Sequence, residues 1–259
     1  ATASTLVMDI GSGVEQSLGD VLGGAGATEN QLALTKAGAG TLILTASNAI
    51  SGTVTVSGGI LRVDNDGALG ATSAGTTAGS GGTLQLSDGI TVSGETITVN
   101  GNGDNARGGL QAASGATATW AGDVVIGSAA RIGAQANGTL TVTGVIDDGA
   151  ATNALRISAD QSGGVVVLSG QSTYGGGTEI LRGTLRLGTN DALPTTSILN
   201  VQSTNLSELA VFDLAGFDQR VGGLTRSASG WAGVVTNSAA TTSTLTVSNA
   251  VAAFSFGGE

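Results

Sequence analysis

The stretch TLILTASNAISGTVTVSGGILRVDNDGALGATS, residues 41–73, is built from short apolar and β-branched runs separated by small turn residues. Within runs such as TLILT (41–45) and TVTVSGGILRV (53–63), large apolar residues alternate with small or polar ones, which is typical of half-buried strands. Glycine, asparagine and aspartate between the runs favour tight turns. The stretch therefore predicts a series of short strands, and its part up to Val63 offers no reactive side chain.

The same pattern recurs without a gap 124 positions downstream, as VVVLSGQSTYGGGTEILRGTLRLGTNDALPTTS at residues 165–197. The inward apolar positions Val56 and Val63 become Ile180 and Leu187. Identical residues mark the structural repeat: Leu44, Gly52, Gly59 and Leu61 recur as Leu168, Gly176, Gly183 and Leu185. Such a repeat indicates an architecture in which each unit stacks on its neighbour.

The composition favours a repetitive β core. Only 3% of the 259 residues are aromatic and 45 are glycine, so the core must be built from small and β-branched side chains. We expect an all-β solenoid, a parallel β-helix with three short strands per coil and about 4.8 Å between coils. At about 22 residues per coil, the chain would form roughly 11–12 coils. The rod would be about 55 Å long.

Charge and residue usage exclude several function classes. The chain has 19 acidic and 9 basic residues, a net charge of −10, and its one lysine is Lys36; an acidic surface argues against a nucleic-acid partner. It has no cysteine and no histidine, which excludes disulfides, Ser-His-Asp catalysis and His- or Cys-ligated zinc. The sequence contains no uninterrupted apolar run long enough for a membrane helix.

Gly40 and the run that follows it to Val63 resemble the passenger-associated transport repeat of bacterial autotransporters. The second copy matches that pattern through Tyr174, Gly176, Gly177 and Thr178. Residues 100–149 and 209–225 are similar to neighbouring coils of the same family. The resemblance implies a right-handed parallel β-helix, carried to the surface of a Gram-negative cell by a C-terminal outer-membrane barrel that we expect in the parent protein and that this chain lacks.

We therefore expect a single β-helical passenger segment over residues 1–259. Its clear repeat units are 38–73 and 162–197, with intervening coils at 83–149 and later coils at 200–249. The first residues, ATASTLVMDIGSG, have neither an initiator methionine nor an apolar leader, so we interpret the chain as a mature protein or an excised fragment.

Carboxylate pairs are the remaining candidates for chemistry. They are Asp64 with Asp66, Asp147 with Asp148, and Asp213 with Asp218. Their positions beside glycine or asparagine at strand ends favour turn roles over catalysis. DNDG (64–67) lacks the later ligands of an EF-hand, and GNGDNARGG (101–109) falls short of the calcium-binding nonapeptide. We expect no catalytic residue, no metal site and no cofactor.

Aromatic residues are the candidates for special positions. Trp120 lies in the strand-like run TATWAGDVVIG and is expected to fill a widened coil. Trp231, between glycine and alanine, is the better candidate for a binding surface, and Tyr174 is a second candidate.

Three functions compete. The preferred one is a non-catalytic cell-surface structural or adhesive passenger, extracellular on a Gram-negative bacterium, whose loops bind a host or cell-surface receptor or a glycan, or self-associate. The alternative is a self-assembling extracellular fibre or surface-layer subunit. The third is a polysaccharide-active enzyme, against which the scattered arginines and the acidic balance argue.

Overall fold

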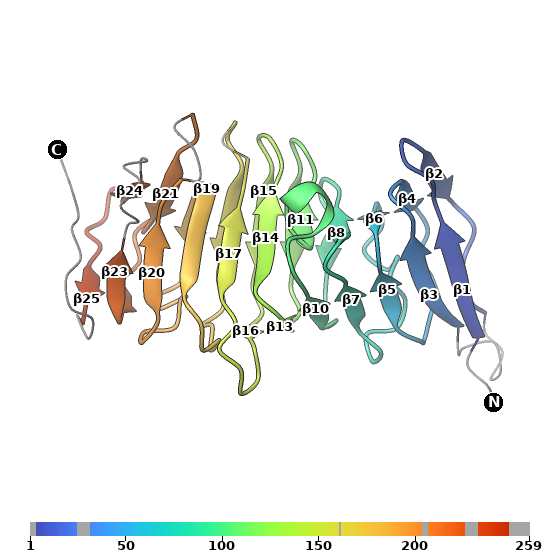
Figure 1. Cartoon of the computed structure of the whole chain (residues 1–259), viewed down its shortest axis with the longest axis horizontal. Helices are drawn as coiled ribbons and strands as arrows, with labels where there is room; N and C mark the ends of the chain where they lie inside the picture. The colour runs from blue at the N-terminus through green and yellow to red at the C-terminus, as the bar shows by residue number, and fades with distance from the viewer. Residues whose placement is uncertain (1–3, 25–31, 161, 204–206, 226–232, 249–259) are drawn as a thin grey trace.

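The computed structural model describes residues 4–24, 32–160, 162–203, 207–225 and 233–248. Every strand pair in these ranges is parallel, and the strands stack as a β-solenoid of about nine turns (Figure 1). Strand β1 lies at one end of the stack and β25 at the other. The fold class predicted from the sequence is confirmed, because each turn passes through up to three parallel sheets.

Sheet A forms the first side of the solenoid. Its strands, in stacking order, are β1 (Ser4–Asp9), β3 (Leu32–Ala37), β5 (Val54–Val56), β7 (Thr76–Ala78), β10 (Ile97–Val99), β13 (Val124–Ile126) and β16 (Ile146–Asp147). A separate pair, β22 (Gln219–Val221) with β25 (Leu245–Val247), lies near the end of the stack.

Sheet B forms the second side. It contains β2 (Glu15–Leu18), β4 (Thr41–Leu44), β6 (Gly59–Val63), β8 (Gly82–Leu86), β11 (Leu110–Ala112), β14 (Ala130–Ala134), β17 (Leu155–Ser158), the first part of β19 (Thr178–Leu187), β20 (Ile198–Val201) and β23 (Gly223–Thr225). A short 3-10 helix, η1 (Asp104–Ala106), lies in the loop before β11.

Sheet C forms the third side. It contains β9 (Thr91–Val92), β12 (Thr117–Trp120), β15 (Thr139–Val142), β18 (Val165–Leu168), the second part of β19, β21 (Ala210–Asp213) and β24 (Gly233–Thr236). Strand β19 therefore belongs to two sheets, since its first residues pair with β17 and its last with β18.

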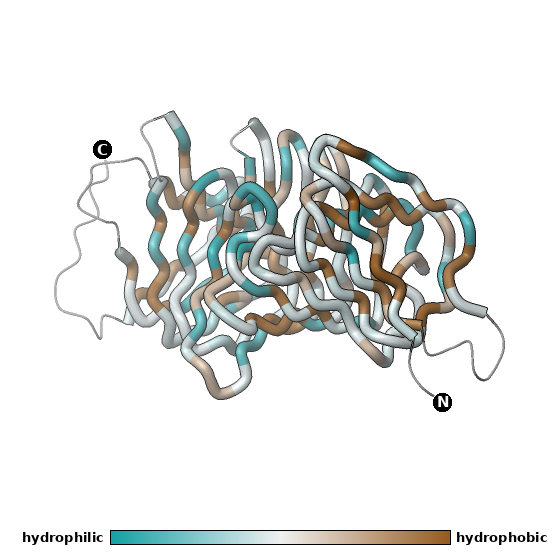
Figure 2. The backbone as a smooth tube through the Cα atoms, turned by 45° about the vertical axis from the view of Figure 1, so that its right-hand side comes forward, coloured by the Kyte–Doolittle hydropathy of each residue, from teal (hydrophilic) through white to brown (hydrophobic). Residues whose placement is uncertain are grey.

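Columns of apolar side chains fill the interior. In sheet B, one inward column is fully buried over seven successive turns: Leu42, Leu61, Leu84, Leu110, Ile132, Ile157 and Ile180. Figure 2 shows apolar residues recurring along successive strands. Burying each such side chain contributes about 1.5–3 kcal/mol, so the repeated column is a main source of stability in a chain with few aromatic residues.

The sequence-based number of coils, 11–12, is wrong. The turns differ in length, because Leu42 pairs with Leu61 across a short turn whereas Leu84 pairs with Leu110 across a longer one. The longer turns carry corner loops, such as residues 101–109, which lengthen the chain without adding a strand to the stack. Sheet B has ten strands within the described ranges, and the assumption of a uniform period overestimated this number.

The two copies of the repeat lie on different sides of the solenoid. In the first copy, β4 and β6 belong to sheet B, whereas the matching strands of the second copy, β18 and the end of β19, belong to sheet C. Both copies close a short turn of the same length, pairing Leu42 with Leu61 and Val166 with Leu185. Five successive strand pairings in sheet B lead from Leu42 to Ile157. After Ile157 the chain passes on to sheet C, where the second copy begins with β18.

Candidate functional site

Tyr174 is not a surface residue, so the prediction that it belongs to a binding surface is wrong. Its side chain is fully buried, and its Oη lies 2.5 Å from Oγ1 of Thr178. Burial raises the pKa of the phenol well above its ordinary value. The matching residue of the first copy, Ile50, is also fully buried, so the ring fills an inward position next to a turn. Trp231 lies outside the described residues.

Trp120 is an interior residue, as expected from the sequence. The side chain is fully buried between its register partners Val92 and Val142. Its indole Nε1 donates a hydrogen bond to the carbonyl oxygen of Asp123 at 3.3 Å. The one polar atom of the ring therefore has a partner inside the coil.

The candidate carboxylates bond to neighbouring backbone, and several link successive turns. Asp66 accepts a hydrogen bond from the backbone N–H of Thr91, and Asp218 accepts one from Thr244. Asp147 accepts hydrogen bonds from the hydroxyl of Thr173 and from the N–H of Gly149, which lower its pKa. These contacts agree with the turn roles expected from the sequence, and they extend them by joining one coil to the next.

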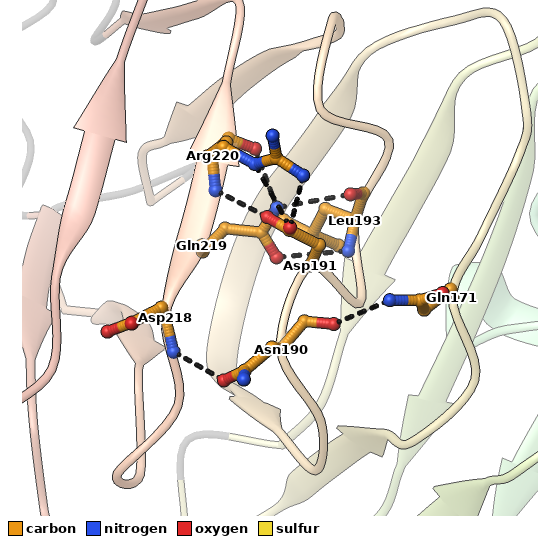
Figure 3. Close-up of polar contacts among 7 residues, drawn as sticks. All are labelled: Gln171, Asn190, Asp191, Leu193, Asp218, Gln219 and Arg220. Carbon is orange, nitrogen blue, oxygen red and sulfur yellow. Dashed lines mark hydrogen bonds and ion pairs between the residues drawn. The ribbon is translucent and has the colours of Figure 1, made fainter.

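A polar network near the C-terminal end of the stack has the same linking role (Figure 3). Nη2 and Nε of Arg220 donate to Oδ2 of Asp191 at 2.7 and 3.0 Å, and the backbone N–H of Arg220 donates to Oδ1. The guanidinium holds the pKa of Asp191 below its ordinary value. The backbone N–H of Asp218 donates to Oδ1 of Asn190. Because these groups already bond to one another, we assign them a structural role.

Gln219 also links neighbouring turns, through its side-chain amide, and the sequence analysis did not predict this role. The side chain is fully buried, and its amide both accepts from the N–H of Leu193 at 3.0 Å and donates to the carbonyl of Leu193 at 3.1 Å (Figure 3). The amide thus bonds to Leu193 as a neighbouring strand would. The signal was a glutamine among apolar residues of the 209–225 segment.

Four arginines gather near the middle of sheet B, so the expectation of scattered arginines is wrong. Arg131 of β14 is the register partner of Arg156 of β17, and Arg182 of β19 follows beside Ser158. Arg107 follows helix η1 and lines a narrow pocket with Arg182. Register brings these side chains together although a whole turn of the chain separates each from the next.

A polar pocket of about 260 Å³ opens between these arginines and helix η1. Its lining residues are Asn105, Ala106, Arg131, Ser158, Leu181, Arg182 and Glu208. A narrower pocket beside it shares Ser158 and Arg182. We call the larger of the two the arginine pocket.

Ion pairs and hydrogen bonds hold most of the cations in place. Nε of Arg156 donates to Glu179 at 2.8 Å. Arg182 donates from Nε to Oγ of Ser158 at 3.0 Å, and its Nη1 lies 3.5 Å from Glu208.

Arg131 differs from the other arginines in this cluster. Its Nη1 donates to the carbonyl oxygen of Ala106 at 2.8 Å, but its buried Nε has no hydrogen-bond partner among the described residues. Burial and then the nearby Arg156 and Arg182 lower its pKa. A buried donor without a partner is unfavourable, so the position of this guanidinium costs free energy that the rest of the fold must offset.

Comparison with protein families identifies the repeats. The model of the passenger-associated-transport-repeat family matches residues 34–63 and 161–187. The chain carries two passenger-associated-transport repeats. No curated protein and no solved structure matches it. The passenger repeats and the β-solenoid together support an autotransporter passenger.

The arginine pocket lies where the second passenger repeat departs from the first. Arg182 occupies the position that Gly58 has in the first repeat, and Glu179 the position of Thr55. The first repeat therefore lacks both the guanidinium and the carboxylate. A signal in the sequence was the nearly even spacing of four arginines, which is close to one turn of the solenoid: Arg107, Arg131, Arg156 and Arg182.

Metal clusters and membrane-spanning helices are both absent from the part of the chain that the structure describes. These residues contain no group of three or more His, Cys, Asp or Glu side chains that could hold a metal ion. None of their helices is long and apolar enough to cross a membrane.

Proposed function

We propose that this chain is a non-catalytic autotransporter passenger that lies outside the cell on a Gram-negative bacterium and attaches it to host or neighbouring cells. The observation that carries the proposal is the position of the two passenger repeats within one stack of parallel coils. A stack of this kind is stabilised by contacts between neighbouring turns, so it can hold a binding surface at a distance without a globular core.

The arrangement of the carboxylates supports a role without catalysis. Asp66 and Asp218 each bond to a backbone N–H of the next turn, and Asp213 bonds to Arg186. Their contacts are with the chain itself, whereas two-carboxylate hydrolysis requires a pair of acids on either side of a substrate. The absence of histidine and cysteine from the sequence removes the commonest nucleophile and base pairs.

The outward faces support a role in attachment. Outward positions of the strands carry polar residues such as Thr55, Thr98, Thr141, Arg156 and Asn200, and the chain has a net charge of −10. Polar, rigid faces suit contact with hydrated glycans or protein surfaces. On this proposal the rod acts as a spacer whose individual pockets determine what is bound.

The test uses the source bacterium and an antibody raised against this chain. Intact cells should be labelled, external protease should remove the label, and electron microscopy should show rods projecting from the outer membrane. Deletion of the gene should lower attachment to host or sister cells, and full-length protein supplied from a plasmid should restore it. Label reached only after lysis would contradict surface display, and unchanged attachment would contradict adhesion. Filaments longer than one chain would favour a fibre subunit instead.

A further inference from the structure

We propose that the arginine pocket binds one acidic monosaccharide unit of a glycan, with the sugar carboxylate held by Arg131 and Arg182. The inference does not rest on the proposed function, because it uses only the chemistry of the pocket. The pocket is not a general feature of the passenger repeat, because the first copy has Gly58 at the position of Arg182. The proposal therefore assigns a ligand class to residues that belong to the second copy and its neighbouring coils.

The cations of the pocket favour an anionic group. Two guanidiniums and one carboxylate, that of Glu208, line it, which leaves a net positive charge. A third guanidinium, that of Arg156, acts on Arg131 from the neighbouring strand, although it is itself paired with Glu179. A bound carboxylate would relieve the repulsion among them, and Nη2 of Arg131 and Nη2 of Arg182 are guanidinium nitrogens to which no hydrogen bond within the described residues is assigned. Planar guanidinium groups recognise carboxylates with paired hydrogen bonds, which a single ammonium cannot do.

The other lining groups favour a sugar. Asn105 and Glu208 line the pocket with an amide and a carboxylate, and both kinds of group bind sugar hydroxyls. Each also has a partner within the chain, since the amide of Asn105 donates to Asp104 and Glu208 pairs with Arg182. Only Ala106 and Leu181 are apolar among the lining residues, so the pocket has little surface for an apolar peptide side chain. Its volume of about 260 Å³ is close to the lower end for small-molecule sites, which is about 300 Å³. That size suits a single sugar ring.

The rim of the pocket is held in a fixed and strained conformation. Asn105 and Ala106 have φ values of 49° and 57°, in the left-handed region, which asparagine tolerates and alanine rarely adopts. The loop is fixed by Arg131, which donates to Ala106, and by Thr83, whose hydroxyl accepts from the N–H of Asp104 and donates to the carbonyl of Gly108. Strain of this kind concentrates at binding sites, and a fixed rim lowers the ordering cost of binding.

The experiment measures binding to the whole chain by the ¹⁵Nε–¹Hε signals of its arginines. The probes are methyl β-D-glucuronide and a methyl sialoside, which carry a carboxylate on a sugar. Methyl β-D-glucoside tests the sugar without the charge, acetate tests the charge alone, and a glutamate-containing tripeptide tests a peptide carboxylate. We expect at least one acidic sugar to shift the Arg131 signal and to bind at least about tenfold more tightly than glucoside, acetate and peptide.

Variants locate the binding. R131Q should weaken binding of the acidic sugar by about tenfold or more. N105G keeps the left-handed backbone and removes only the rim amide, so it should weaken binding severalfold without loss of folding. R220Q, in the distant Asp191 network, is the matched control and should bind like the wild type. The inference is overturned if neither acidic sugar binds, if acetate or the peptide binds as tightly, or if R220Q weakens binding as much as R131Q.

Discussion

The hydroxyl groups of Tyr174 and Thr178 share a buried hydrogen bond of 2.5 Å, and neither side chain reaches solvent. The matching residues of the first repeat are Ile50 and Val54, which are 0% and 1% exposed. An apolar pair at one copy is thus replaced by a hydrogen-bonded polar pair at the other. The two changes compensate each other, since a buried hydroxyl needs a partner.

This relationship predicts coupling between the two positions. Y174F removes one hydroxyl and leaves that of Thr178 buried without its partner, so it should lower the free energy of unfolding by about 1–2 kcal/mol. T178V should have a similar effect, because it leaves the buried hydroxyl of Tyr174 without its hydrogen-bond partner. The double variant should cost less than the sum, with a coupling of about 1 kcal/mol measured by chemical denaturation. Strict additivity of the two losses would contradict the pairing.

Close backbone contact predicts that Gly144 cannot be replaced. A Cβ at Gly144 would overlap the carbonyl oxygen of Gly122 on the preceding turn. G144A should therefore push two turns apart and cost about 3 kcal/mol or more. G81A is the matched control, because a Cβ there meets no atom within 4 Å. We expect thermal unfolding to separate the two variants, and equal melting temperatures would refute the close contact.

Asp213 should contribute to stability at neutral pH and lose its contribution in acid. Burial alone would raise its pKa, but hydrogen bonds from Ser238, Arg186 and Ala215 outweigh burial and hold the pKa below its ordinary 3.8. The folded state therefore binds the proton less tightly than the unfolded state. Its stabilisation is complete above about pH 4 and decreases as the pH falls through the folded pKa.

Substitution of Asp213 tests this contribution. D213N places an amide donor opposite the guanidinium of Arg186 and should cost about 2 kcal/mol at pH 7. The more exposed pair of Asp191 and Arg220 provides the control, and D191N should cost less than about 1 kcal/mol. Denaturant titrations at pH 7 and pH 3 give the free energy of unfolding of the wild type and of both variants. A D213N loss that stays unchanged in acid would argue against the ion pair as its cause.

Glu95 should have the opposite pH dependence. Burial raises its pKa above the ordinary 4.5, although a hydrogen bond from Thr76 opposes the shift. The folded state therefore holds this proton more tightly than the unfolded state, and ionisation of Glu95 lowers stability at neutral pH. That loss is relieved as the pH falls through the raised pKa towards 4.5.

The variant E95Q removes the charge and keeps an oxygen that can accept from Thr76. It should be more stable than the wild type at pH 7, and the difference should disappear below about pH 4. E179Q, which breaks the partly exposed pair with Arg156, serves as the control and should not increase stability at pH 7. A less stable E95Q at pH 7 would show that ionised Glu95 is better solvated than its burial implies.

Local periodicity was enough to predict the inward residues but not the corners. Leu44, Leu61, Leu168 and Leu185 are buried as the alternation implied, because successive residues of a strand face opposite sides. Tyr174 lies in the loop before β19, where no such period applies, and its inward direction follows from packing in the interior of the solenoid. The coil number was overestimated for the same reason, since loops such as 101–109 have no period.

The arginine pocket depends on register between turns, which a single sequence leaves open. Arg131 and Arg156 become partners because β14 and β17 pair with residues 130 and 155 aligned. A shift of one position would turn one of them inward. The spacing of the arginines near one turn was visible, but helix η1, which closes the pocket, gave no helical signal within GNGDNARGG.

The separation of the two repeats shows that the unit of sequence duplication is out of phase with the structural period. In the first copy the repeated pattern forms strands of sheets B and A, whereas in the second copy it forms strands of sheets C and B. The three faces are therefore interchangeable with respect to this unit. An inserted copy need not be a whole number of turns, and a surface feature grafted onto it could be pointed in a new direction by choosing where along the chain it enters.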